Sequence, residues 1–194
     1  MIPSDFHIYI LPGGDGANDY GWFDWLKQEL EKQGYKNVTI ATASILSPAD
    51  RAKYYESQYI LDKNSVLVGH SFGALAAMKW IEQSNISIHG LLLVDPSVKC
   101  AFEEPWEEDE EQRLPYLNSW DWQMDLKKVR GLVKRKRIIG CEILGTKNPN
   151  RRNVHEEIYA QQLDAPYIFT CGQLQHFSGK EEPIVLENLL ALLP

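Results

Sequence analysis

The pentapeptide at residues 69–73, G-H-S-F-G, constrains the fold of this chain more than any other feature. An apolar stretch typical of a buried strand, residues 65–68, precedes it, and a stretch of helical character, residues 74–81, follows it. Glycines two residues before and after Ser71 let the backbone turn sharply from strand to helix, which leaves the hydroxyl exposed above the sheet. Although the pentapeptide alone matches many unrelated loops, this context predicts a nucleophile elbow with Ser71 as the candidate nucleophile.

Strand and helix patterns alternate along all 194 residues. They predict a single α/β domain, residues 1–194, with a mostly parallel sheet of about six strands and helices on both faces. The expected strands are residues 6–11, 38–43, 65–68, 90–94, 138–144 and 167–171. The expected helices are residues 22–33, 48–61, 72–83, 153–163 and 181–193.

Residues 97–130 interrupt this alternation, because they separate the fourth and fifth strands by more than a crossover requires. Long insertions of this kind are usually functional, and this one is rich in aromatic residues. Two interpretations remain open. The segment is a cap over a substrate pocket, to which Trp22, Trp106 and Trp120 contribute, or it holds a crossover helix, residues 120–129, whose aromatic side chains pack in the core.

The formal net charge of −7 comes from one local run. Seven of the 27 acidic residues lie in residues 103–111, and the remaining 20 balance the 20 basic residues. This balance argues against a nucleic-acid-binding protein, which would carry a basic stripe. The acidic run is a candidate docking surface for a protein partner. We interpret the basic run at residues 134–137 as a solvated lead-in to the fifth strand.

Cysteine usage and the N-terminus indicate the compartment. Cys100, Cys141 and Cys171 are odd in number and widely spaced, so they form neither a disulfide framework nor a metal-binding pair. We interpret them as thiols, mainly buried, in a reducing compartment. The apolar stretch at residues 8–11 is too short for a signal peptide or a membrane span. We therefore expect a cytoplasmic protein with no membrane association and no metal site.

Among the five histidines, His176 is the candidate general base. It lies in the loop after the last expected strand, at the edge of a parallel sheet where Ser71 also emerges. A serine that precedes the histidine along the chain matches the order in α/β-hydrolases. The other histidines are interpreted as structural or exposed: His7, His70, His89 and His155.

The glycine-rich loop at residues 12–16 follows the first expected strand. Asp19 and Trp22 stand where a dinucleotide-binding motif needs glycine and a phosphate-binding loop needs lysine, so neither motif is present. In a serine hydrolase the same loop supplies a backbone N–H that binds the developing oxyanion. Gly14 and Phe72, the residue after Ser71, are therefore the candidate donors.

The chain resembles the small single-domain α/β-hydrolases of the retinoblastoma-binding-protein-9 and YdeN type. The segments that carry the resemblance span almost the whole chain, at residues 11–14, 21–26, 68–74, 120–122, 145–149 and 176–177. The resemblance implies a reduced hydrolase sheet, carboxylester-type substrates and no cofactor.

One position departs from that family, in which an aspartate directly before a proline in the loop after the penultimate strand orients the histidine. Asn148 stands there in this chain, and an amide carries no charge to stabilise an imidazolium. Three explanations remain open. The acid has moved to Asp95 at the end of the fourth expected strand, where it would otherwise cap the insertion; Asn148 supports a less active site; or catalysis is lost.

The sequence therefore predicts a serine hydrolase that cleaves a small uncharged carboxylic ester or thioester through an acyl-enzyme. In this prediction Ser71 attacks, His176 transfers the proton, and Asp95 or Asn148 orients His176. The alternative is a catalytically impaired protein of the same fold that binds a ligand or a protein partner.

Overall fold

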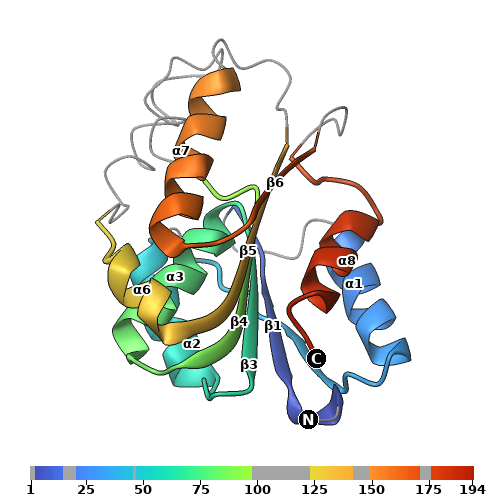
Figure 1. The fold of residues 1–194 in the computed structure, drawn as a ribbon. Coiled ribbons are helices and arrows are strands. Elements are labelled where there is room, and N and C mark those ends of the chain that lie inside the picture. The colour runs from blue at the N-terminus through green and yellow to red at the C-terminus, as the bar shows by residue number, and fades with distance from the viewer. Residues whose placement is uncertain (1–2, 15–20, 46, 98–122, 142–148, 171–175) are drawn as a thin grey trace.

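A computed structural model describes residues 3–14, 21–45, 47–97, 123–141, 149–170 and 176–194. Within these ranges the chain forms a six-stranded, fully parallel sheet in the order β2-β1-β3-β4-β5-β6 (Figure 1). The strands are β1 (His7–Leu11), β2 (Asn37–Ile40), β3 (Ser65–His70), β4 (Ile88–Val94), β5 (Val133–Cys141) and β6 (Tyr167–Thr170). The helices are η1 (Pro3–Asp5), α1 (Gly21–Lys32), α2 (Pro48–Gln58), α3 (Phe72–Ser84), α6 (Leu126–Leu132), α7 (Pro149–Leu163) and α8 (Pro183–Leu190). The predicted α/β fold is confirmed.

Helices cover both faces of the sheet, with α1 and α8 on one face and α2, α3, α6 and α7 on the other (Figure 1). Successive strand residues point to opposite faces. In β3, Val66 and Val68 belong to the core under α1 and α8, whereas Leu67 belongs to the core under the other four helices. By the same alternation, the side chain of His70 points toward α1 and α8. None of the described helices is both long and apolar enough to cross a bilayer.

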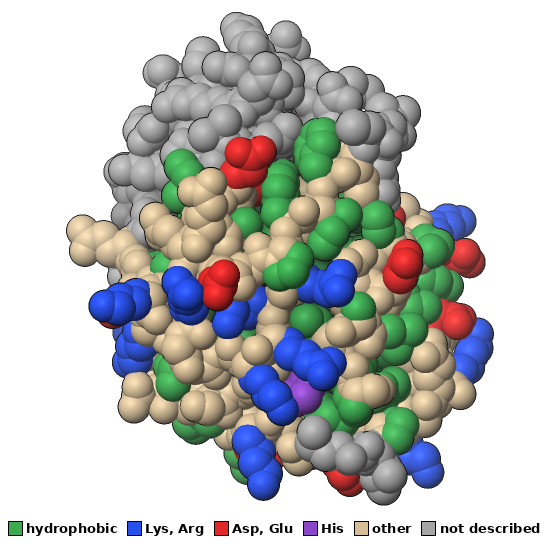
Figure 2. Space-filling model, viewed as in Figure 1, with side chains coloured by type: hydrophobic (Ala, Val, Ile, Leu, Met, Phe, Trp, Pro, Cys, Tyr) green, Lys and Arg blue, Asp and Glu red, His purple; other side chains and the backbone are tan. Residues whose placement is uncertain are grey.

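The basic run at residues 134–137 lies inside β5, so its interpretation as a lead-in to the strand was wrong. β5 begins at Val133, and Arg135 is in register with Gly90 of β4. Long side chains let cations fit into a strand, since they can reach polar groups on neighbouring helices. Arg135 donates to the carbonyl groups of Leu192 and Leu193, just after α8. In the orientation of Figure 1, the space-filling view in Figure 2 shows Lys and Arg side chains across the middle and lower part of the surface.

Helix α6 begins at Leu126, near the end of the 97–130 insertion, and continues to Leu132. Asp125 caps it by accepting a hydrogen bond from the backbone N–H of Lys128 at 2.8 Å, and Leu126 and Val129 are buried in the core. This end of the segment is thus a crossover helix, which begins six residues later than expected. The proposed cap residues Trp106 and Trp120 lie outside the described residues, as does the acidic run at 103–111.

His89, on β4, is buried, and its ring Nε2 lies 3.0 Å from the carbonyl oxygen of Leu192. A carbonyl only accepts, so this nitrogen carries the proton. Burial lowers the pKa of His89; the Leu192 carbonyl raises it by less, and the positive charges of Lys134 and Arg135 lower it further. The folded protein therefore favours the neutral form of this side chain.

This shift sets a pH dependence for folding. Between the lowered pKa of folded His89 and the ordinary value of about 6.5, the unfolded chain binds more protons than the folded one. We therefore expect the free energy of unfolding to decrease as the pH falls through about 6.5. The measurement is the urea midpoint at several pH values, with His89→Gln as the control, since its amide still donates but does not titrate. An equal loss of stability in both proteins would contradict the assignment to His89.

Candidate active site

The turn between β3 and α3 has the geometry of a nucleophile elbow. Ser71 is the single residue between the two elements, with φ of 54° and ψ of −118°, which are unfavourable for a residue with a side chain. Its backbone N–H donates to the carbonyl of Val94 at 3.0 Å, and its carbonyl accepts from the N–H of Ala74 at 3.1 Å. These bonds hold the strained residue at the carboxyl edge of the sheet.

Both glycines of the pentapeptide are required by close backbone approach. A Cβ atom on Gly69 would lie 2.8 Å from the backbone N of Ala74. A Cβ atom on Gly73 would lie 2.6 Å from the carbonyl oxygen of Pro12 and nearer still to that of Leu11. The elbow therefore packs directly on the end of β1 and on the glycine-rich loop that follows it.

Asp95 and His176 meet at the same edge of the sheet. Asp95 directly follows β4, and its Oδ2 atom accepts a hydrogen bond from Nδ1 of His176, which lies beyond β6. Asp95 is fully buried, whereas a quarter of the His176 side chain is exposed. Because the carboxylate accepts a hydrogen bond from Nδ1–H, the proton stays on Nδ1 and Nε2 of His176 is left as the basic nitrogen. The buried thiol of Cys141, with Sγ 3.7 Å from Asp95 Oδ2, is a second donor to this carboxylate.

The hydroxyl of Ser71 has a serine partner. Its Oγ lies 3.0 Å from Oγ of Ser97, and the backbone N–H of Ser97 donates to the Ser71 carbonyl at 3.2 Å. Both serines are buried. The tripeptide from Asp95 to Ser97 therefore contacts His176 at one end and Ser71 at the other.

The glycine-rich loop lies against Ser71. A Cβ atom on Gly13 would be 2.8 Å from Cβ of Ser71, and Gly14 has a φ of +48°, which favours glycine. The buried guanidinium of Arg51, on α2, donates to the carbonyl of Pro12 at 3.2 Å and also to the carbonyl of Gly14. Sequence reasoning missed Arg51, because an arginine on an amphipathic helix normally indicates an exposed side.

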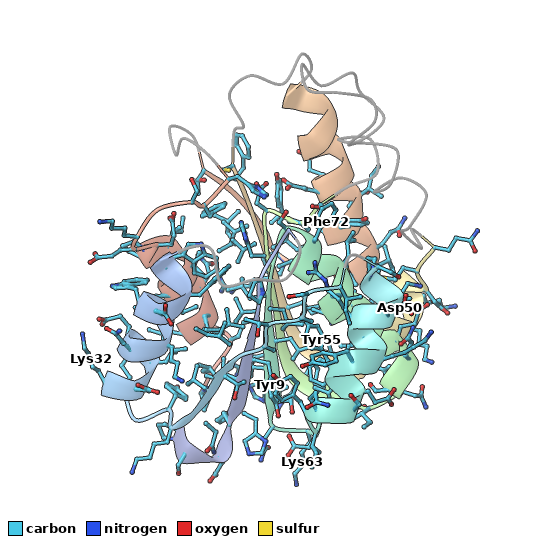
Figure 3. All side chains as sticks on the ribbon, turned by 180° about the vertical axis from the view of Figure 1, so that it is seen from behind. Tyr9, Lys32, Asp50, Tyr55, Lys63 and Phe72 are labelled. Carbon is cyan, nitrogen blue, oxygen red and sulfur yellow. The ribbon has the colours of Figure 1, made fainter. Side chains whose placement is uncertain are left out.

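The remaining predicted site residues are placed as follows. Phe72 is the first residue of α3 and lies nearer the carboxyl edge of the sheet than Tyr9 and Tyr55, above them in Figure 3, although all three belong to the same core. Trp22 has no exposed surface, and its ring packs edge-on against His70 with centroids 5.5 Å apart. It therefore lies in the core beside the elbow. Asn148 lies outside the described residues, as do Trp106 and Trp120.

Two further features lie outside the predicted site, and the first is near enough to Asp95 for that charge to help raise the pKa of Tyr167. The Tyr167 hydroxyl donates to Oε2 of the buried Glu156 at 2.7 Å, and burial, followed by the charge of Glu156, raises the pKa of Tyr167.

A surface hollow of about 670 Å³ between the end of α7 and the start of β6 is lined partly by Gln161 and Asp164. It faces the amino end of β6, away from the edge that carries Ser71. Within the described ranges, no group of three or more His, Cys, Asp or Glu side chains is arranged to hold a metal ion.

Comparison with known proteins shows the family to which the chain belongs. A model of the serine hydrolase family matches residues 8–120, a range that contains Gly14, Ser71 and Asp95. The chain belongs to the serine hydrolase family. Over 125 residues, 59% of the chain, it is 28% identical to the serine hydrolase RBBP9 of Rattus norvegicus, of which the match covers 61%. Over 99 residues, 47% of the chain, it is 28% identical to the putative hydrolase YdeN of Bacillus subtilis, of which it covers 51%. These matches span less than two thirds of each relative.

Solved structures agree on the fold of this family member. The crystal structure of the B. subtilis ydeN gene product aligns with a TM-score of 0.68 at 20% identity, over 96% of this chain and 98% of that one. FphF, a fluorophosphonate-binding serine hydrolase of Staphylococcus aureus, aligns with a TM-score of 0.55 at 10% identity, over 97% of this chain and 84% of that one. The resemblance to the RBBP9 and YdeN type is thus confirmed.

Proposed function

We propose that this protein is a hydrolase that cleaves a small uncharged carboxylic ester or thioester through an acyl-enzyme on Ser71. The observation that carries the proposal is the hydrogen bond between His176 and the buried Asp95, at the sheet edge where a serine is held in elbow geometry. Membership of the serine hydrolase family supports it. The acidic run at residues 103–111 would disfavour anionic substrates if it lies near the entrance.

In the first half-reaction, the Ser71 hydroxyl turns from Ser97 toward Nε2 of His176 and attacks the substrate carbonyl carbon. His176 takes the hydroxyl proton at Nε2 and becomes an imidazolium, which the Asp95 carboxylate stabilises. The tetrahedral intermediate then collapses, the bond to the leaving group breaks, and His176 returns the proton to the departing alcohol or thiol. Ser71 is left as an ester of the acyl group.

In the second half-reaction, His176 removes a proton from a water molecule that attacks the acyl-enzyme. The acid leaves, and Ser71 recovers its proton. We assign the oxyanion hole to the backbone N–H groups of Gly14 and Phe72. Gly14 lies on the loop that packs against Ser71, and the N–H of Phe72 lies at the positive end of the α3 dipole.

In this proposal Asp95 replaces the aspartate that the family carries at the position of Asn148. Asp95 follows β4 and His176 follows β6, so both emerge at the carboxyl edge where Ser71 also lies. The chain order of serine, acid and histidine is therefore kept although the acid comes from an earlier strand. A full charge then remains beside the imidazolium, which an amide would not supply.

A fluorophosphonate probe tests the proposal. We expect the folded protein to gain the mass of one phosphonyl group, as the Ser71 oxygen displaces fluoride from phosphorus. Ser71→Ala should remove this labelling, whereas Ser57→Ala, at an exposed serine on α2, should leave it unchanged. A folded wild-type protein that takes up no label would instead favour a ligand-binding or partner-binding protein. Hydrolysis of p-nitrophenyl acetate and of an acetyl thioester, measured on the same samples, compares the two substrate classes.

A further inference from the structure

His70, the second residue of the elbow pentapeptide, is a buried side chain that the proposed reaction does not use. It is the last residue of β3, in register with Val94 of β4, and has no exposed surface. Since it shares the alternation of Val66 and Val68, its ring lies on the side of the sheet covered by α1 and α8. The sequence suggested only a structural or exposed histidine here.

The ring of His70 bonds to the main chain of His176. Its Nε2 lies 2.8 Å from the carbonyl oxygen of His176, so this nitrogen must carry the proton. The two imidazole rings are also in contact, with centroids 4.7 Å apart and planes tilted by 42°. Trp22 and Phe23 of α1 pack edge-on against the His70 ring at 5.5 and 5.8 Å, which fixes its orientation.

The main chain that His70 contacts is strained. His176 and Phe177 have φ of 51° and 50°, in the left-handed region that side chains disfavour. A residue with a side chain persists in this region only where the surroundings hold it. Phe177 is anchored by full burial, and the His176 ring is anchored by Asp95. The hydrogen bond from His70 restrains the His176 carbonyl, and therefore the backbone from which this ring projects.

We propose that His70 is a positioning residue for the base: its imidazole, protonated on Nε2, holds the left-handed turn at His176 and so directs Nε2 of His176 toward Ser71. This inference rests on the proposed roles of Ser71 and His176. Because Ser71 directly follows His70 in the chain, a single rigid strand end sets both the position of the nucleophile and that of the base. Trp22 contributes indirectly, by packing against the His70 ring.

Two substitutions separate the hydrogen bond from the packing. His70→Phe keeps an aromatic ring against Trp22 and Phe23 but has no donor, whereas His70→Gln carries an amide N–H near the position of Nε2. We expect His70→Phe to lower kcat for an ester by about 10- to 100-fold with KM changed less than about twofold, as a misdirected base would. We expect His70→Gln to recover most of that loss.

A second arm tests whether His70 acts through His176. In a His176→Ala background, His70→Phe should have no further effect on the residual rate, because the group that it positions is gone. A wild-type kcat in His70→Phe, or an equal loss in both backgrounds, would overturn the proposal.

Amide hydrogen exchange tests the structural role of His70 without relying on enzyme activity, so its result is independent of the proposed function. In His70→Phe we expect faster exchange at the amide of Phe177 with unchanged protection in β3 and β4. Unchanged exchange at Phe177 would overturn the role of His70 whether or not the enzyme is active. A wild-type protein that neither hydrolyses esters nor binds the probe would instead overturn the proposed function, and with it the catalytic part of this inference.

Discussion

We expect Asp95→Asn to lower the turnover of an ester substrate by about ten-thousandfold, the loss seen when the triad aspartate of a serine protease becomes asparagine. The amide supplies no negative charge to the imidazolium that forms on His176. Its NH2 group can also donate to Nδ1, which moves the ring proton of His176 to Nε2 and removes the base. Because Asp95 is fully buried beside His176, solvent would not replace the lost charge.

The substitution should leave the fold intact, so that lost turnover reports on chemistry. Asp95 has a φ of +43°, and asparagine tolerates the left-handed region as well as aspartate does. The measurement is kcat for p-nitrophenyl acetate together with the thermal unfolding midpoint of each variant. Removal of the base in His176→Ala should give a similar residual rate, because the two residues act as a unit.

Asn148→Asp is the matched comparison. If Asp95 already supplies the charge, an added carboxylate at position 148 should change kcat by less than about twofold, because the imidazolium needs one charged partner. The reverse pattern, with a silent Asp95→Asn and an Asn148→Asp that raises the rate, would contradict the assignment of Asp95. It would return the orienting role to the loop after β5.

Much of this arrangement could be predicted from the sequence because it depends on chain order and strand ends. Apolar strands that alternate with helices predict a parallel sheet, and in such a sheet the residues after β3, β4 and β6 emerge at one edge. Ser71, Asp95 and His176 are those residues, and the structure brings Asp95 and His176 into contact. The sequence left Asp95 and Asn148 as alternatives, since it does not show which side chain reaches the imidazole.

Other contacts could not be predicted, because they join segments without a recognisable spacing. His70 and the carbonyl of His176 are 106 residues apart, and Arg51 reaches Pro12 across 39 residues. The basic stretch of β5 was misjudged for a related reason. Lys134 and Arg135 are exposed, as the sequence suggests, but the run pairs with β4, and Arg135 bonds to the carbonyl groups of Leu192 and Leu193 after α8, which only tertiary structure brings together.

We expect Gly73→Ala to destabilise the protein by about 3 kcal/mol or more, at the upper end of what overpacking costs. The added methyl group would overlap the carbonyl oxygens of Leu11 and Pro12. These are backbone atoms at the end of β1, so no side chain can rotate away and either α3 or the strand end must move. For a chain of this size the loss corresponds to a fall of about 10 °C in Tm.

The same displacement should slow fluorophosphonate labelling, because the carbonyl groups that meet the new methyl group begin the loop that packs against Ser71. Gly131→Ala is the matched control: Gly131 is exposed on α6, and no atom beyond its own helix backbone lies within 4 Å of its Cβ position. Alanine in a helix is more favourable than glycine by up to about 1 kcal/mol, so this variant should be slightly stabilised and should label normally. A Gly73→Ala protein with unchanged Tm and labelling rate would show that the elbow and the end of β1 are not in the close contact on which the oxyanion assignment depends.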